Sequence, residues 1–156
     1  MAKLLSALPV GSVVKSTNTK YNGKVIRWIV GTQDTANGRT GLVAEKMITL
    51  KCFDAKESSN PNSSRQSYGN NRYSQSNIDQ WLNSQAASWY SARHSYDAPP
   101  NNANVWSNYN EYDTEAGFLS NFEADFRKAI LDAVIRVAKN TVTDGGGYED
   151  LSLLHI

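Results

Sequence analysis

The stretch from Tyr68 to Tyr90 constrains the fold of this 156-residue chain most strongly, because it holds the clearest amphipathic helix pattern. Ser76 can cap the helix N-terminus, and Asp79, three residues on, completes a variant capping box. Apolar residues then recur at i, i+3, i+4, i+8 and i+11, which places them on one helical face. These residues are Ile78, Trp81, Leu82, Ala86 and Trp89. The pattern predicts a helix whose tryptophans anchor the core.

The first third of the chain predicts an antiparallel meander. Three strands are expected, at residues 11–15, 24–30 and 42–53, the last with a break near residues 45–46. Asn22-Gly23 is a strong hairpin turn between the first two strands, and Asn37-Gly38 forms the tip of the next loop. The apolar face of such a sheet must be covered, and the helices downstream are the available cover.

Residues 57–110 are rich in Ser and Asn with aromatic residues interleaved, which favours long ordered loops around the first helix. A second helix is expected to open at Ser120, with Glu123 completing its capping box. Its C-terminal end stays open between helix and strand, and the β-branched residues near Val134 favour a strand. A glycine-rich turn at 144–147 and a short apolar strand at 151–156 follow.

These patterns predict a single domain, residues 1–156, of the α+β class. We expect an antiparallel sheet or meander packed by two helices with long ordered loops. The predicted structural core combines the second strand with one face of each helix. It consists of Trp28, Ile78, Trp81, Leu82, Trp89, Phe122, Phe126 and Ile130.

Charge and apolar content exclude several classes of function. Sixteen basic against fifteen acidic residues give a net charge of +1, which argues against binding to nucleic acid or to an anionic membrane. No stretch approaches the roughly 20 apolar residues needed to cross a bilayer, and the N-terminus does not resemble a signal peptide. We therefore expect a protein that is made and kept in a cytoplasm, or assembled there into something larger. The single cysteine, Cys52, is expected to be a buried structural thiol.

Catalytic and metal-binding motifs are not visible in the sequence. His94 and His155 lie on different segments without a Cys or carboxylate at ligand spacing, so neither a metal site nor a cofactor is expected. Nucleophile-elbow, Cys-His and HExxH patterns are missing as well, and we predict that the protein is not an enzyme. The acidic residues Glu111, Asp113 and Glu115 are expected to be solvated surface charges. A cell-wall hydrolase that used them is the least favoured alternative.

Aromatic residues among Asn and Ser in the irregular segments are the candidates for ligand binding. Tyrosine with small polar residues on loops is typical of recognition surfaces, where rigid rings give contact area and polar groups give hydrogen bonds. The same rings could instead pin the loops, and the pattern leaves both readings open. The candidate residues are Tyr96, Trp106, Tyr109, Glu111, Tyr112 and Asp113.

Several segments together resemble an uncharacterised domain family of bacteriophages, prophages and gut Firmicutes. The resemblance extends from about Gly11 to Gly147, through GSVVKSTNTKYNGKVIRWIV, MITLKCFDAKE, RQSYGNNRYSQSNIDQWLN, DAPPNNANVWSNYNEYDTEAGFLSNF and VAKNTVTDGGG. The most specific piece is Trp81-Leu82-Asn83, preceded by Tyr73 and Ser76. Asp79 stands where the family usually has a basic residue, so a salt bridge made by that residue does not carry over.

This resemblance implies a distant relation to the C-type lectin fold and a place in phage tail-module or surface-associated proteins without an assigned reaction. Family members usually continue through further strands after the Asp-Gly-Gly turn, whereas this sequence stops at Ile156. The resemblance therefore implies a fold that is incomplete at its C-terminus. We expect either a natural short form that pairs with a partner or a truncated product.

The expected function is a non-catalytic structural or recognition module of a phage or prophage, associated with the tail and binding a host-surface component. Its expected partners are other phage structural proteins or a host-surface glycan or protein, without nucleic acid or membrane insertion, and homo-oligomers are possible. The alternative is a small phage-encoded inhibitor of a host defence system.

Overall fold

A computed structural model describes residues 4–106, 111–139 and 146–155 of the chain. The chain forms two compact units. Unit 1 contains the residues up to Thr49 together with Asn121–Ile130, and unit 2 contains Leu50–Ser120 together with Leu131–His155. That the chain is one domain remains a prediction.

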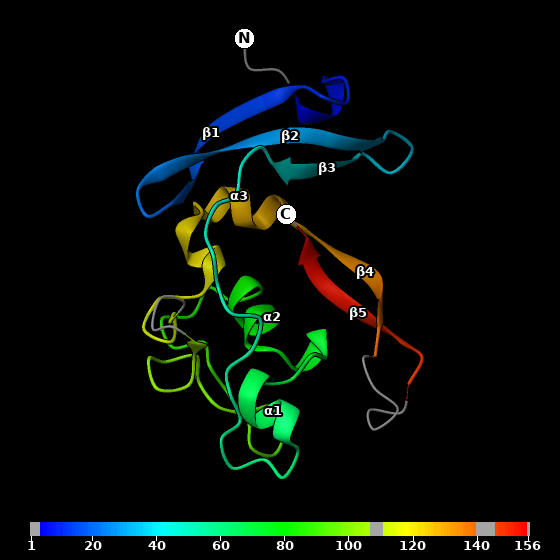
Figure 1. Cartoon of the computed structure of the whole chain (residues 1–156). Coiled ribbons are helices and arrows are strands. Elements are labelled where there is room, and N and C mark those ends of the chain that lie inside the picture. The colour runs from blue at the N-terminus through cyan, green and yellow to red at the C-terminus, as the bar shows by residue number, and fades with distance from the viewer. Residues whose placement is uncertain (1–3, 107–110, 140–145, 156) are drawn as a thin grey trace. The chain divides into compact units, whose positions relative to one another are not determined.

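The sheet of unit 1 is the antiparallel meander expected from the turn residues (Figure 1). Its strands are β1 (Val13–Tyr21), β2 (Lys24–Asp34) and β3 (Arg39–Ala44). Asn22 and Gly23 join β1 to β2 with φ values of 47° and 74°, the left-handed conformation that a two-residue hairpin turn requires. Both outer strands run antiparallel to β2, and each pairing contains one irregularity in register. The first two strands are longer than expected.

The core of unit 1 forms around Trp28 on β2, which is 3% exposed. Its indole Nε1 donates a hydrogen bond to the buried Thr19 hydroxyl at 2.9 Å. The ring of Phe122 meets Trp28 edge-on at 6.3 Å between centroids, and Phe122 also forms an isolated β-bridge with Thr19. Ile26 and Val30 are buried on the same strand. Alternation along β2 therefore builds this core, as a period of two predicts.

The second helix differs from the expected one. A 3-10 helix, η4 (Phe118–Asn121), precedes α3 (Ala124–Ala129), whose N-cap is Glu123 without a side-chain cap bond. The expected capping box on Ser120 is therefore wrong. The bridge between Phe122 and Thr19 holds the backbone in an extended conformation at the point where the helix was expected to begin. Phe126 and Ile130 are partly exposed.

Unit 2 contains α1 (Ser63–Tyr68), η2 (Tyr73–Gln75), α2 (Asn77–Leu82) and a hairpin of β4 (Leu131–Ala138) with β5 (Tyr148–His155). The strand expected near Val134 thus corresponds to β4, which begins at Leu131. Asp144 and Gly145 of the expected turn, and Ile156 of the final strand, lie outside the described residues. Together with the short 3-10 helix η1 (Leu5–Ala7) in unit 1, these elements confirm the predicted α+β class with antiparallel sheets.

Helix α2 starts where the sequence predicts and ends earlier. The Ser76 hydroxyl caps it by accepting from the Asp79 N–H. The helix stops at Leu82 instead of continuing to Trp89, because the next segment forms backbone hydrogen bonds with another part of the chain. The N–H of Gly117 donates to the Ala86 carbonyl, and the N–H of Leu119 to that of Ser84.

The tryptophans of this region still reach one core. Trp81 contacts Phe118 and Tyr112 at 5.1 and 5.5 Å between ring centroids, and Trp89 stacks on Tyr112 at 5.3 Å. Trp81 and Trp89 are 1% and 7% exposed, and their indoles donate to the carbonyls of Ala116 and Glu115. Ile78 and Leu82 are partly exposed.

Residues 47–53, expected to complete the third strand, contain no strand. The Cys52 carbonyl accepts from the Tyr112 hydroxyl, and the Phe53 carbonyl accepts from the Ile78 N–H. Partners outside any sheet thus satisfy these two carbonyls. No helix within the described residues has the length and apolar character needed to cross a bilayer.

Candidate functional site

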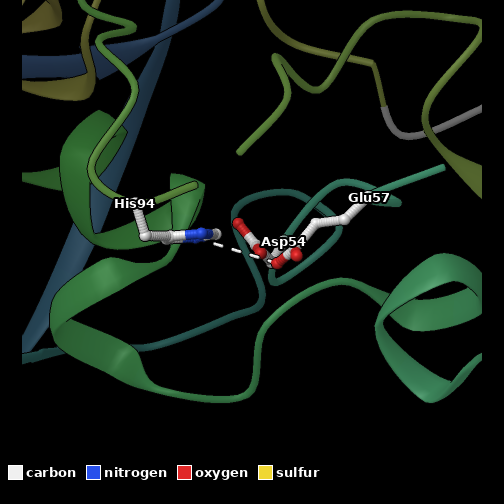
Figure 2. Close-up of side chains that lie close together, drawn as sticks. All are labelled: Asp54, Glu57 and His94. Atoms are coloured by element: carbon white, nitrogen blue, oxygen red, sulfur yellow. Dashed lines mark ion pairs between the residues drawn. The ribbon is translucent and has the colours of Figure 1, made fainter. Parts of the chain in front are cut away.

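Two features of unit 2 stand out: a buried cluster of titratable side chains and an exposed pair of aromatic rings. The cluster comprises Asp54, Glu57, His94 and Asp97, which we call the acidic–His94 cluster. Its members come from two loops, one before α1 and one after α2. Figure 2 shows the side chains of Asp54, Glu57 and His94 directed toward one another.

Asp54 is fixed by the start of α2 and by the turn after α1. One carboxylate oxygen, Oδ1, accepts from the Asn77 N–H at 2.9 Å, and Oδ2 accepts from the Asn70 N–H at 2.7 Å. Gly69 precedes Asn70 with a φ of 75°, and a Cβ there would lie 2.3 Å from the Ala55 carbonyl oxygen. A glycine is therefore needed where the C-terminal end of α1 approaches the backbone of Ala55.

Glu57 is held by the turn that follows it. Its N–H donates to the Arg65 carbonyl of α1, and its own carbonyl accepts from the Asn60 N–H. The Asn60 side-chain amide donates to Oε2 of the carboxylate. Oε1, in contrast, is buried without a hydrogen-bond partner in the described part of the chain. The side chain is 0% exposed.

His94 and Asp97 form the other wall. The carboxylate of Asp97 accepts from the Arg93 N–H at 2.7 Å and, at 3.4 Å, from the Asn77 side-chain amide. His94 Nδ1 lies 3.0 Å from the Ser95 carbonyl oxygen, which can only accept, so Nδ1 carries the proton in this hydrogen bond. In the neutral ring, Nε2 then holds a lone pair. Nε2 is buried and finds no hydrogen-bond partner among the residues described.

The distances between side-chain N and O atoms of the cluster are too long for direct hydrogen bonds. They are short enough for these atoms to bind one metal ion together. His94 Nε2 lies 3.8 Å from Glu57 Oε1 and 4.0 Å from Asp97 Oδ1. One ligand atom from each of Asp54, Glu57 and His94 can be chosen so that all three lie within 4.8 Å of one another. Atoms bound to one ion at about 2.0–2.2 Å lie about 3–4 Å from each other. These side chains are the group that could hold a metal ion.

The buried environment of the cluster disfavours the charged form of Asp54. Burial raises the pKa of Asp54 to about 6, although the N–H groups of Asn70 and Asn77 lower it. The charge of Asp97 raises this pKa and that of His94 lowers it. Within the described residues, no Lys or Arg forms an ion pair with Asp54, Glu57 or Asp97. Buried carboxylates without a cationic partner are costly, so this cluster favours a bound cation or a proton.

The exposed pair of rings consists of Tyr68 and Trp106, which we call the aromatic platform. Tyr68 is 69% exposed and ends α1, and Trp106 is 57% exposed. Their rings lie nearly parallel, with an interplanar angle of 20° and centroids 6.1 Å apart. The Trp106 indole donates to the Ser67 carbonyl, and the Lys56 ammonium lies 5.7 Å from the indole centroid. Two large rings are thus held in a defined orientation while facing solvent.

The other predicted ligand-binding residues do not gather in one place that the structure defines. Tyr96 is 51% exposed, Glu111 is exposed and Asp113 is partly exposed. Tyr109 lies outside the described residues. Tyr112 is 0% exposed, and its hydroxyl donates to the Cys52 carbonyl at 3.0 Å, so this ring faces the core instead of solvent. Burial raises the pKa of its hydroxyl far above the ordinary range.

The acidic–His94 cluster and the pairing of Tyr68 with Trp106 are not predicted by the sequence patterns. The cluster combines two pairs with i,i+3 spacing, Asp54 with Glu57 and His94 with Asp97, which are 40 residues apart. The spacing was a weak signal, because only the fold brings the pairs together. Tyr68 was treated as part of the helix-defining stretch, and its partner Trp106 is distant in sequence.

Comparison with known proteins identifies a family without an assigned activity. The profile of a family described as a domain of unknown function (DUF6273) matches residues 16–153. No curated protein and no solved structure matches the chain. The expected extent of the resemblance, from about Gly11 to Gly147, agrees with this match.

Proposed function

This chain belongs to the DUF6273 family, and we propose that it is a non-catalytic recognition module of a phage or prophage tail that binds a host-surface glycan. The observation that carries the proposal is the aromatic platform, with both rings more than half exposed and held in fixed orientation. The resemblance of the Trp81-Leu82-Asn83 region to phage and prophage domains supports the proposed context.

The platform has the physical properties that glycan binding requires. An aromatic face offers a large apolar surface to the C–H groups of a sugar ring. The indole is already held by its hydrogen bond to the Ser67 carbonyl, so little side-chain freedom is lost when a ligand binds. Lys56 beside the ring can donate to sugar hydroxyls or pair with an anionic substituent. These groups suit a polar ligand with one apolar face.

A non-catalytic role is consistent with the exposure of Glu111 and Asp113, the carboxylates among the predicted ligand-binding residues. Glu111 is exposed and Asp113 partly so, as expected of solvated surface charges. We include in this proposal a distant relation to the C-type lectin fold, which the resemblance implies and which would fit a glycan ligand.

Binding of the purified chain to isolated host cell-wall polysaccharide tests the proposal. Trp106→Ala should weaken binding more than tenfold, because a ring at the centre of an interface commonly contributes about 2 kcal/mol or more. Tyr148→Ala is the matched control, since Tyr148 is a 63% exposed aromatic residue on β5 whose ring lies beside Arg136 of β4. This variant should bind like the wild type.

Two outcomes would overturn the proposal. One is full binding by Trp106→Ala with an unchanged fold. The other is the absence of any glycan binding. Stoichiometric capture of a host defence protein in its place would favour the inhibitor alternative.

A further inference from the structure

The acidic–His94 cluster brings three carboxyl groups and one imidazole together in a buried position. The side chains of Glu57, His94 and Asp97 are 0%, 10% and 1% exposed, and Asp54 as a whole is 6% exposed. Three carboxylates therefore share one imidazole, and the described residues add no lysine or arginine ion pair. Burying such charges is expensive unless a cation compensates them.

Two atoms in the cluster have the properties of metal ligands. Glu57 Oε1 and His94 Nε2 are both buried and make no hydrogen bond within the described part of the chain. They face each other at 3.8 Å, too far for a hydrogen bond and within the span of two ligands on one ion. The other nitrogen of the ring donates to the Ser95 carbonyl, which leaves the Nε2 lone pair directed into the cluster.

We propose that Glu57 Oε1 and His94 Nε2 are ligands of one divalent transition metal ion, with a carboxylate oxygen of Asp54 as the third. Asp97 Oδ1, 4.0 Å from His94 Nε2, is the fourth candidate ligand. An imidazole combined with carboxylates suits Zn²⁺ and related first-row ions, whereas Ca²⁺ and Mg²⁺ prefer oxygen ligands alone. The proposed ion is therefore of the Zn²⁺ class.

Groups around these ligands already have the orientation that a metal site needs. The Asn60 amide holds the second oxygen of Glu57, and the Asn77 amide contacts the Asp97 carboxylate. The ring of His94 is oriented by the Ser95 carbonyl. Such hydrogen bonds from outer groups fix the tautomer and direction of metal ligands. The ion would join the loop before α1 to the loop after α2.

The inference is independent of the proposed glycan binding, and metal titration tests it. The full chain, without a polyhistidine tag and stripped with a chelator, is titrated with Zn²⁺ by calorimetry and with Co²⁺ by visible absorption. We expect one site per chain, a Co²⁺ spectrum typical of nitrogen and oxygen ligands, and removal of that spectrum by Zn²⁺. Saturation at about 100 times Kd should raise Tm by about 5–10 °C.

Variants locate the site. His94→Gln and Glu57→Gln preserve size and should weaken Zn²⁺ binding by at least about tenfold. His155→Gln is the matched control, because it removes the only other histidine of the chain. This variant should bind Zn²⁺ like the wild type.

The inference is wrong if the wild type shows no stoichiometric Zn²⁺ or Co²⁺ binding. It is equally wrong if His94→Gln keeps full affinity or His155→Gln loses it. If a cluster variant fails to fold, the wild-type titration still decides, since the absence of a Co²⁺ spectrum and of any Tm shift contradicts the site.

Discussion

Asn77 forms one hydrogen bond with the Asp54 carboxylate and a second with the backbone of the residue that follows Asp54. The Asn77 N–H donates to Asp54 Oδ1 at 2.9 Å, and the Asn77 side-chain oxygen accepts from the Ala55 N–H at 2.8 Å. Both side chains belong to buried residues, 0% and 6% exposed. This pair therefore fixes the first residue of α2 against the segment that carries Asp54 and Glu57.

Asn77→Ala should lower the free energy of unfolding by about 2 kcal/mol, because it leaves the Ala55 N–H buried without its acceptor. Urea denaturation measures the loss. Asn71→Ala is the control, since Asn71 is exposed and its truncation should stay within about 0.5 kcal/mol. Equal stability of the two variants would contradict a structural role for the Asn77 bonds.

Alanine substitutions at Gly69 and Gly38 should destabilise the protein to different extents, because the two glycines have different surroundings. Both have positive φ, 75° and 64°, but only Gly69 has a backbone oxygen 2.3 Å from the position of a Cβ. Gly38→Ala should cost about 1 kcal/mol from strain alone. Gly69→Ala should cost about 1–3 kcal/mol more, because the Ala55 carbonyl must move and because the ψ of −161° at Gly69 is a conformation that essentially only glycine adopts. Thermal denaturation of both variants measures the difference, and similar losses would refute the close approach.

The hydrogen bonds of Glu149 on β5 should make the stability of the protein depend on pH. Its carboxylate accepts from Arg72 Nε at 3.0 Å and from the Ser74 hydroxyl at 2.6 Å. The Arg72 and Ser74 hydrogen bonds lower the pKa of Glu149 below its ordinary 4.5, so the contribution to stability is present above about pH 4.5. It is lost as the pH falls through the lowered pKa of the folded state.

Glu149→Gln should therefore reduce stability by about 1 kcal/mol at pH 7 and by progressively less below pH 4.5. Urea denaturation at several pH values gives both curves. Glu123→Gln is the control, because Glu123 is exposed and its side chain makes no cap bond. A loss for Glu149→Gln that did not change with pH would argue against the ion pair.

Cys52 should react slowly with thiol reagents in the native protein. Burial raises the pKa of its thiol to about 11 from 9.0, so at pH 8 the thiolate is about 100-fold less abundant than for an ordinary cysteine. Alkylation followed by mass spectrometry should give a rate at least about 100-fold below that in denaturant. The native rate should rise with pH until about pH 11. Equal rates would show an accessible, ordinary thiol.

Local signals in the sequence predicted part of the fold. Asn22-Gly23 specified the first hairpin because few other residues adopt the required left-handed turn. Ser76 specified the start of α2 because its hydroxyl caps the first turn. In both cases the deciding interaction lies within a few residues.

Non-local hydrogen bonds decided the elements that were predicted wrongly. Residues 47–53 have strand propensity, yet Tyr112 and Ile78 supply the partners of Cys52 and Phe53. The pairing of Gly117 with Ala86 likewise ends α2 before Trp89. The acidic–His94 cluster was unpredictable for a related reason, since its two pairs are 40 residues apart in the sequence and meet only in the folded protein.

The indole N–H signals of the tryptophans test glycan recognition by the aromatic platform most directly. Trp28, Trp81 and Trp89 are buried, and Trp106 alone of the four is exposed. Fragments of host cell-wall polysaccharide are added to ¹⁵N-labelled protein, and Trp106→Phe assigns the Trp106 signal. We predict that this signal shifts in a saturable manner while the other three stay in place. Saturable glycan binding that leaves the Trp106 signal unmoved, or no binding at all, would contradict the proposed function.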